Sequence, residues 1–186
     1  MKVKINTPLT KAAAKELRAG DSCLITGVIY AARDAAHKRL AELIKSEKEL
    51  PFDIKNSVIY FVGPTPAKPG QVIGSAGPTT SYRMDAYSPA LIEIGLTGMI
   101  GKGQRSPEVI DAIKKHGAVY FGAIGGCGAL LGMCVKKSEL VAYEELGAEA
   151  ILKLEVENFP AVVVIDSQGN NLYEIGRRDF LDSLKR

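Results

Sequence analysis

The stretch TGMIGKGQRSPEVIDAIKKHGAVYFGA, residues 97–123, contains one complete alternation of a predicted strand, a helix and a second strand. The apolar run Gly98–Gly101 predicts the first strand. The helix should begin after Ser106, because serine is a favoured N-cap, and should stop at Gly117, because glycine is common just past a helix end. A second apolar run, Val119–Ala123, predicts the next strand. This order of elements favours an α/β fold.

The same alternation of apolar and amphipathic segments extends over the rest of the chain. Helical periodicity is clearest in Ala35–Glu49, and a further helix is predicted over Ala86–Ile94 if Pro89 lies in its first turn. Further strands are expected over Lys2–Ile5, Cys23–Ile29, Val58–Val62, Val72–Ser75, Ile151–Glu157, Ala161–Asp166 and, after a turn, around Leu172–Ile175. We therefore predict a mixed sheet with flanking helices.

Length and composition indicate a single globular domain over residues 1–186, with residues 177–186 as a frayed helical tail. Hydrophobic residues make up 46% of the chain, which excludes a disordered protein. The longest apolar runs are far shorter than the ~20 residues that span a bilayer, and no secretory signal is recognisable. We expect a cytoplasmic protein that does not bind membranes.

The formal net charge of +3 is too small to indicate a nucleic-acid partner, which would require a clustered basic patch. The three cysteines, Cys23, Cys127 and Cys134, are an odd number in a chain without an export signal, which argues against a disulfide framework. Their spacing also lacks the short repeats typical of iron–sulfur ligands. We therefore expect three buried, hydrophobic thiols and no metal site on this chain.

One unusual segment, Gly74–Asp85, leaves a predicted strand, turns at a Gly-Pro pair and presents three consecutive hydroxyls before a helix. A helix N-terminus with nearby hydroxyls is a natural anion site, and the guanidinium of Arg83 matches a carboxylate. The hydroxyls of Thr79, Thr80 and Ser81 are therefore candidate ligands of an anion. The alternative is an ordinary N-cap in which Thr80 or Ser81 bonds the free amides.

Two further strand-to-helix junctions carry cations. Arg33 and His37 lie one turn apart at the start of a predicted helix, where a positive charge is unfavourable for the helix dipole. In the alternative interpretation, Arg33 pairs with Asp34 or another carboxylate of the same segment, and His37 caps an edge of the core. Lys102 lies between two glycines that would let a ligand approach the backbone. Together these cations suit a small substrate with two carboxylates.

The glycine-rich segment 122–134 does not have the G-x-G-x-x-G spacing of a dinucleotide site, and residues 101–106 do not form a P-loop. No nucleotide cofactor is therefore predicted.

At these residues the sequence resembles a known family. The strings GPTTSYRMD (77–85), RDAAHK (33–38) and GKGQRS (101–106) are similar to the β subunit of iron–sulfur hydro-lyases, the class I fumarases and L(+)-tartrate dehydratases. Similar residues continue from Leu146 to Ala161, so the resemblance covers nearly the whole chain. Tyr82 and Ala32 depart from the family, which usually has glycine at both positions.

The resemblance implies a swivelling β/β/α domain that closes over a 4Fe-4S cluster held by three cysteines of a separate α subunit. The expected reaction is the reversible hydration of fumarate to L-malate, a step of the tricarboxylic acid cycle, in a heterotetramer of two α and two β subunits. Thr79, Arg83 and Lys102 are the implied catalytic residues, and Arg33, Thr80, Ser81, His37 and Asp85 the substrate-binding ones. A hydroxyl is a poor base on its own, so Thr79 needs a relay, and His37 and Asp85 are the two candidates.

Three other functions remain open at the level of sequence. The chain could be the β subunit of tartrate dehydratase, which forms oxaloacetate with the same kind of site. It could be a non-catalytic module that binds dicarboxylates without a partner. It could also carry a cluster on its own cysteines.

Overall fold

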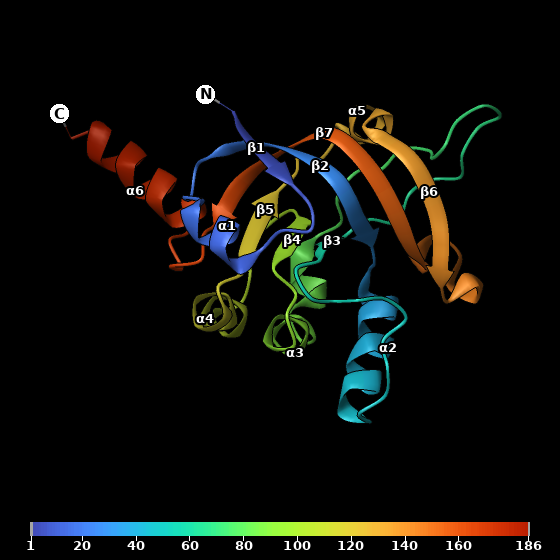
Figure 1. The fold of residues 1–186 in the computed structure, drawn as a ribbon. Coiled ribbons are helices and arrows are strands. Elements are labelled where there is room, and N and C mark those ends of the chain that lie inside the picture. The colour runs from blue at the N-terminus through green and yellow to red at the C-terminus, as the bar shows by residue number, and fades with distance from the viewer. Residues whose placement is uncertain (1, 186) are drawn as a thin grey trace.

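The computed structural model describes residues 2–185 and contains one sheet of seven strands with helices around it (Figure 1). The mixed α/β fold expected from the sequence is thereby confirmed. The strands are β1 (Val3–Asn6), β2 (Ser22–Ala31), β3 (Val58–Tyr60), β4 (Gly98–Gly101), β5 (Val119–Gly122), β6 (Val135–Ala142) and β7 (Ile151–Ile165). The helices are α1 (Lys11–Glu16), α2 (Asp34–Lys45), α3 (Ser88–Glu93), α4 (Pro107–His116), α5 (Gly128–Met133) and α6 (Leu172–Ser183), with 3-10 helices η1 (Ser81–Met84) and η2 (Glu144–Glu149).

The sheet closes on itself. Strands β2, β3, β4 and β5 are parallel neighbours in that order, and β1 runs parallel to the first half of β2. The long strand β7 is antiparallel to β5 and also to β2, so the pairing returns to the strand from which it started. Strand β6 is the remaining neighbour of β7.

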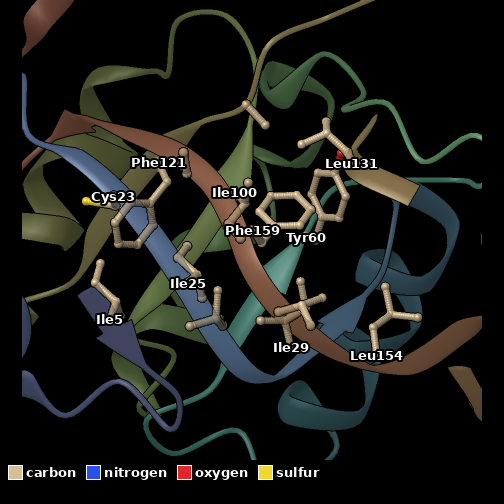
Figure 2. Close-up of a cluster of buried hydrophobic side chains, with 14 of the residues drawn as sticks. Ile5, Cys23, Ile25, Ile29, Tyr60, Ile100, Phe121, Leu131, Leu154 and Phe159 are labelled. Atoms are coloured by element: carbon tan, nitrogen blue, oxygen red, sulfur yellow. The ribbon is translucent and has the colours of Figure 1, made fainter. Parts of the chain in front are cut away.

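Closure creates an inner and an outer core. Alternate side chains of a strand point to opposite faces, so Tyr60, Ile100 and Phe121 lie inside, packed against β2 and β7 (Figure 2). Their neighbours Ile59, Met99 and Tyr120 lie on the outer face, which α2, α3 and α4 cover (Figure 1). Parallel strands buried on both faces are expected to be continuously apolar, as these strands are.

Most predicted elements are present, within a few residues of their predicted limits. Helix α4 has the bounds expected from its caps, and its C-cap Gly117 has a left-handed φ of 75°. Helix α3 has its proline in the first turn, as required. The structure also contains α1, α5 and β6, which the sequence analysis did not predict.

Two predicted strands are absent, and two others are joined into one. Residues 72–75 form no strand, because Ser75 bonds instead to the backbone and side chain of Thr65. The two strands predicted over 151–157 and 161–166 are one strand, β7, which continues past a register shift beside Asn158, whose φ is 50°. Residues 172–175 start a helix rather than a strand, because the side chain of Asn171 accepts a hydrogen bond from the amide of Tyr173 and caps it.

The topology brings four loops to one edge. The carboxyl ends of β2, β3, β4 and β5 point the same way, since these strands are parallel. They are followed by Arg33, the long loop 61–80, Lys102 and the glycine-rich loop 123–127. Of the helices in residues 2–185, none has the length and apolar character that a membrane span requires.

Gly101, at the end of β4, allows close packing that a side chain would prevent. A β-carbon there would overlap the hydroxyl oxygen of Ser81 and come within 2.8 Å of the ring of Phe61. We expect Gly101→Ala to lower the free energy of unfolding by about 2 kcal/mol, the usual range for overpacking. Urea unfolding followed by circular dichroism measures this. The control Gly176→Ala, in α6 with nothing within 4 Å of the new methyl, should be neutral or stabilising; equal stability of both variants would contradict this packing constraint.

Candidate functional site

The candidate site lies at the carboxyl edge of the parallel strands, the usual ligand-binding edge of α/β sheets. The structure brings the segments of all predicted site residues to this edge. Their environments differ, however. Arg83 and Lys102 are exposed, Thr79 and Thr80 are half-buried, and His37 and Ser81 are fully buried.

Thr79 and Thr80 are held by backbone bonds between neighbouring strand ends. The amide of Thr79 donates to the carbonyl oxygen of Phe61 at 2.7 Å, and Thr80 forms an isolated parallel bridge with Lys102. The side chain of Thr80 makes no cap hydrogen bond to η1, so the alternative of an ordinary N-cap at Thr80 is wrong. Thr79 and Thr80 therefore lie beside residues 102–103, here called the lysine loop.

The side chain of Ser81 fixes the position of the lysine loop. Its buried hydroxyl lies 2.9 Å from the hydroxyl of Tyr120 and accepts a hydrogen bond of 3.0 Å from the amide of Lys102. The hydroxyl of Tyr120 also donates to the carbonyl of Gly103 at 2.9 Å, and burial raises the pKa of this tyrosine far above its usual value. Both hydroxyls thus hold the backbone of residues 102–103 in place.

Asp85 is engaged in a buried ion pair that the sequence analysis did not predict. One carboxylate oxygen accepts from Nε of Arg105 and the other from the amide of Ser106, each at 2.6 Å. The side chain of Arg105 is fully buried and donates further to Ser88 Oγ at 2.7 Å. Its guanidinium also lies about 5 Å from the ring centres of two aromatic residues, Phe61 and Tyr120. Asp85 and Arg105 therefore fasten η1 to the start of α4.

A series of ion pairs joins the two arginines of the site, the exposed Arg83 and the half-buried Arg33. Nη2 of Arg83 donates to Oδ2 of Asp34 at 2.7 Å, and Oδ1 of the same carboxylate is 3.7 Å from Nε of Arg33. On its other side, Nη2 of Arg33 is 3.1 Å from Oε1 of Glu149. The predicted pairing of Arg33 with Asp34 is present, and Asp34 also orients Arg83.

Glu149 was not predicted to take part in these ion pairs, because it lies in η2, more than a hundred residues from Arg33. Its second oxygen accepts from the amide of Ala35 at 3.2 Å, so it also serves the first turn of α2. The pairing of Arg33 with Asp34 was predictable, because Asp34 directly follows Arg33 in the first turn of α2.

His37 is a core residue. Its Nδ1 lies 2.8 Å from the carbonyl oxygen of Arg33 and therefore carries the proton, and its ring packs edge-on against Phe61. Within the described chain, Nε2 is buried without a hydrogen-bond partner. Burial lowers the pKa of His37 to about 4, and the nearby Arg105 adds to this effect.

Lys102 is exposed, and across residues 2–185 its ammonium group makes no ion pair. The ammonium nitrogen lies over the loop after β5, where a β-carbon added to Gly125 would be 3.6 Å from it. Glycine at this position therefore leaves room beside the lysine. A positive charge without a partner, next to two threonines and an oriented arginine, can bind a carboxylate.

The cysteines of this chain do not fit an iron–sulfur cluster. Cys23 is buried, where burial raises its pKa to about 11, and Cys127 and Cys134 pack half-buried against the inner core. A thiol with a raised pKa is a poor metal ligand, because the ligand is the thiolate. Among residues 2–185, no group of three or more His, Cys, Asp or Glu side chains could hold a metal ion.

The chain matches one protein family over most of its length. The family model described as "Fumarase C-terminus" matches residues 1–176. The anaerobic class I fumarate hydratase of Escherichia coli K12 is 44% identical over 178 residues, which are 94% of this chain and 32% of that protein. Fumarate hydratase 2 of Leishmania major is 39% identical over 177 residues, 93% of this chain and 31% of that protein.

A different relative is similar along nearly its whole length. The putative L(+)-tartrate dehydratase subunit beta of Methanocaldococcus jannaschii is 42% identical over 172 residues, which are 89% of this chain and 88% of that protein. The chain thus spans about a third of the fumarate hydratases and most of the tartrate dehydratase subunit.

The buried neutral His37 should make stability depend on pH. Its pKa is about 4 in the folded protein and 6.5 in the unfolded chain, so the unfolded state binds the proton first as the pH falls. The contribution of neutral His37 to the free energy of unfolding is present above pH 6.5 and is lost as the pH falls towards 4. Between pH 7 and pH 5 we expect the free energy of unfolding to fall by about 2 kcal/mol. Urea unfolding at both pH values should show this loss in the wild type and in His116→Gln but not in His37→Gln. The same loss in His37→Gln would rule out this origin.

Proposed function

The chain belongs to the fumarase C-terminus family, and on this premise we propose that it is the β subunit of a two-component iron–sulfur fumarase, which reversibly hydrates fumarate to L-malate. The observation that carries the proposal is the bridge between Thr80 and Lys102, which places Lys102 beside the segment that carries Thr79 and continues into Arg83 of η1. Two hydroxyl-bearing residues and two cations at one open edge suit a dicarboxylate with a hydroxyl group.

The site is consistent with half of an active site. Arg83 and Lys102 are exposed, and the cysteines among residues 2–185 do not suit a cluster. In the proposed enzyme, a separate α subunit holds a 4Fe-4S cluster, whose chemistry is that of a Lewis acid for the hydroxyl group. The chain described here would act as a swivelling domain that brings its cations and threonines to the substrate.

The cations of this chain would bind the carboxylates and stabilise the charge that develops when a proton leaves the adjacent carbon. Arg83 donates one N–H to Asp34, and its other N–H groups would bind the substrate. The ammonium of Lys102 forms no ion pair with a carboxylate of residues 2–185. Arg33 is held between Asp34 and Glu149, with a fifth of its side chain exposed. Preorganised cations need little reordering when the substrate arrives.

Thr79 is the proposed proton-transfer group, with Thr80 at the substrate. Of its two candidate relays, Asp85 is bonded through both oxygens to Arg105 and Ser106, and His37 is buried with Nδ1 bonded to a carbonyl. These contacts favour positioning roles for Asp85, His37 and Ser81. The base that relays the proton of Thr79 would then belong to the α subunit.

The further parts of the proposal concern the assembly. We place one domain, residues 1–186, in a cytoplasmic heterotetramer of two α and two β subunits, acting in the tricarboxylic acid cycle. The resemblance of the site strings to the two-component enzymes supports this arrangement.

A second candidate is the β subunit of L(+)-tartrate dehydratase, which forms oxaloacetate. It is favoured by the length of the relative named for that subunit, 88% of which this chain covers. Tyr82, 67% exposed beside Arg83, is the residue most suited to alter substrate choice, since the family usually has glycine there.

The reconstituted complex decides between the two candidates. With the cysteine-bearing α subunit, anaerobically loaded with iron and sulfide, we expect turnover of fumarate and malate measured by the absorbance of fumarate. Turnover confined to L-tartrate would replace the first candidate by the second. No turnover with any of these acids, together with tight dicarboxylate binding by the isolated chain, would leave a binding module.

Substitution of the site residues should abolish turnover without affecting assembly. We expect Thr79→Ala and Arg83→Met to lower kcat by at least about a hundredfold, as loss of a proton-transfer group or a charge-stabilising donor does. Steady-state assays with size-exclusion chromatography of the complex measure both effects. The matched controls Ser183→Ala and Arg178→Met, on the exposed helix α6, should retain full activity. Near-normal rates in the site variants would overturn the assignment.

Asp34 should be needed to orient Arg83. Asp34→Asn keeps the size of the side chain but removes its charge, and we expect kcat/KM to fall about tenfold, equivalent to ~1.4 kcal/mol. Glu145→Gln is the control, since it breaks a neighbouring ion pair, with Arg39, that does not include either site arginine. Unchanged kinetics in Asp34→Asn would show that Arg83 is oriented by other means.

A further inference from the structure

Four large apolar side chains are exposed together near the candidate site. They are Val72 in the proline-rich loop, Ile124 after β5, and Leu130 and Met133 on α5, with exposed fractions of 47%, 68%, 55% and 76%. Val72 and Met133 line one cavity of about 440 Å³, and Ile124 and Leu130 line a second of about 150 Å³ on the other side of α5. Leu130 and Met133 are three residues apart on α5, which places them on neighbouring positions of one helix face. Each of them shares a cavity with one of the two loop residues. The four residues are here called the loop–α5 surface.

The backbone supports this surface firmly. The amide of Ala76 donates to the carbonyl of Gly128 at 2.9 Å, and a β-carbon added to Gly132 would come within 2.6 Å of the carbonyl oxygen of Gly74. The loop and α5 therefore pack backbone against backbone. This packing fixes the position of α5, which carries Leu130 and Met133, against the end of the loop.

The loop–α5 surface has no carboxylate among the residues that line its two cavities, and its charges are lysines. Lys68 lines the first cavity and Lys2 the second, and Nζ of Lys136 donates to the carbonyl of Met133 at 3.1 Å. In segments 63–80 and 122–134, Lys68 is the one charged residue, although 24% of the chain is charged. On the other flank of the site, ion pairs join Arg39 to Glu145 and Arg33 to Glu149. Depletion of charge together with exposed methionine and aliphatic side chains is the composition of the centre of a protein interface.

The same segments border the candidate site directly. Gly125 lies next to the ammonium of Lys102, one residue from Ile124, and Thr79 follows the segment that contacts α5. A partner that contributes groups to a substrate held by Thr79 and Lys102 must therefore lie against one of the two flanks. The apolar flank can be buried without removing paired charges from water.

We propose that the loop–α5 surface is the face on which the cluster-bearing α subunit docks, through an apolar and largely uncharged surface of that subunit. The proposal rests on the proposed function, because it assumes that a second chain completes the site. A second copy of this chain is the competing occupant. Helix α6 also carries exposed apolar residues, such as Phe180, but this helix extends away from the molecule on the side opposite to α5 (Figure 1).

The test places a charge in the proposed interface. Leu130→Glu and Met133→Glu alter exposed side chains and should leave the fold intact, as far-UV circular dichroism and thermal unfolding would verify. We expect each to weaken binding of the α subunit at least tenfold in biolayer interferometry, because a carboxylate in an apolar interface must be removed from water. Phe180→Glu is the control, with the same new charge on α6 and an exposed fraction of 63%; it should bind as the wild type does.

The outcomes separate the two proposals. Failure of the wild-type chain to bind the α subunit would overturn the proposed function itself. Binding by the wild type with unchanged affinity in both glutamate variants, or equal weakening by Phe180→Glu, would overturn the docking surface alone. Sedimentation of the isolated chain tests the competing occupant: a dimer that Met133→Glu dissociates, with α binding unaffected, would assign the surface to a second copy.

Discussion

The structure depends on the double pairing of β7. One edge of this strand pairs with β2 along almost its full length, and the other edge pairs first with β6 and then with β5. Because β2 and β5 stand at opposite ends of the parallel set, this one antiparallel strand closes the sheet. Closure provides the inner core around Tyr60, Phe121 and Phe159, and it leaves the outer face for α2, α3 and α4. The carboxyl ends of four parallel strands are then held at one edge.

At that edge, buried polar groups hold the residues that face outward. The ion pair between Asp85 and Arg105 removes two charges from water, which is tolerated because both carboxylate oxygens and the guanidinium have further partners. Removing one partner of such a pair typically destabilises a protein by ~3–5 kcal/mol. Ser81 and Tyr120 do the same for the lysine loop with neutral groups. The exposed residues of the candidate site are thus held in place by buried polar groups that are hydrogen-bonded.

The edge is asymmetric in its chemistry. One flank holds ion pairs between α2 and η2, and the other is apolar, with lysines but no carboxylate among the residues that line its cavities. An apolar flank beside an exposed lysine without an ion pair among the described residues is unusual for a complete binding pocket, which encloses its ligand. It suits an edge that meets a second surface, and the division of the proposed enzyme into two chains requires such an edge.

The sequence by itself determined the elements whose signals are local. The caps of α4, the proline in α3 and the apolar runs of β3, β4 and β5 identify their elements because each depends on neighbouring residues. The grouping of Arg33, Arg83 and Lys102 at strand-to-helix junctions was visible for the same reason. The capping pair Asn171 and Glu174 was also local, although the apolar alternation of residues 172–175 concealed it. Only the tertiary structure decided that β7 is one strand, that Glu149 pairs with Arg33, and that His37 and Ser81 are buried, since these depend on contacts between residues far apart in the chain.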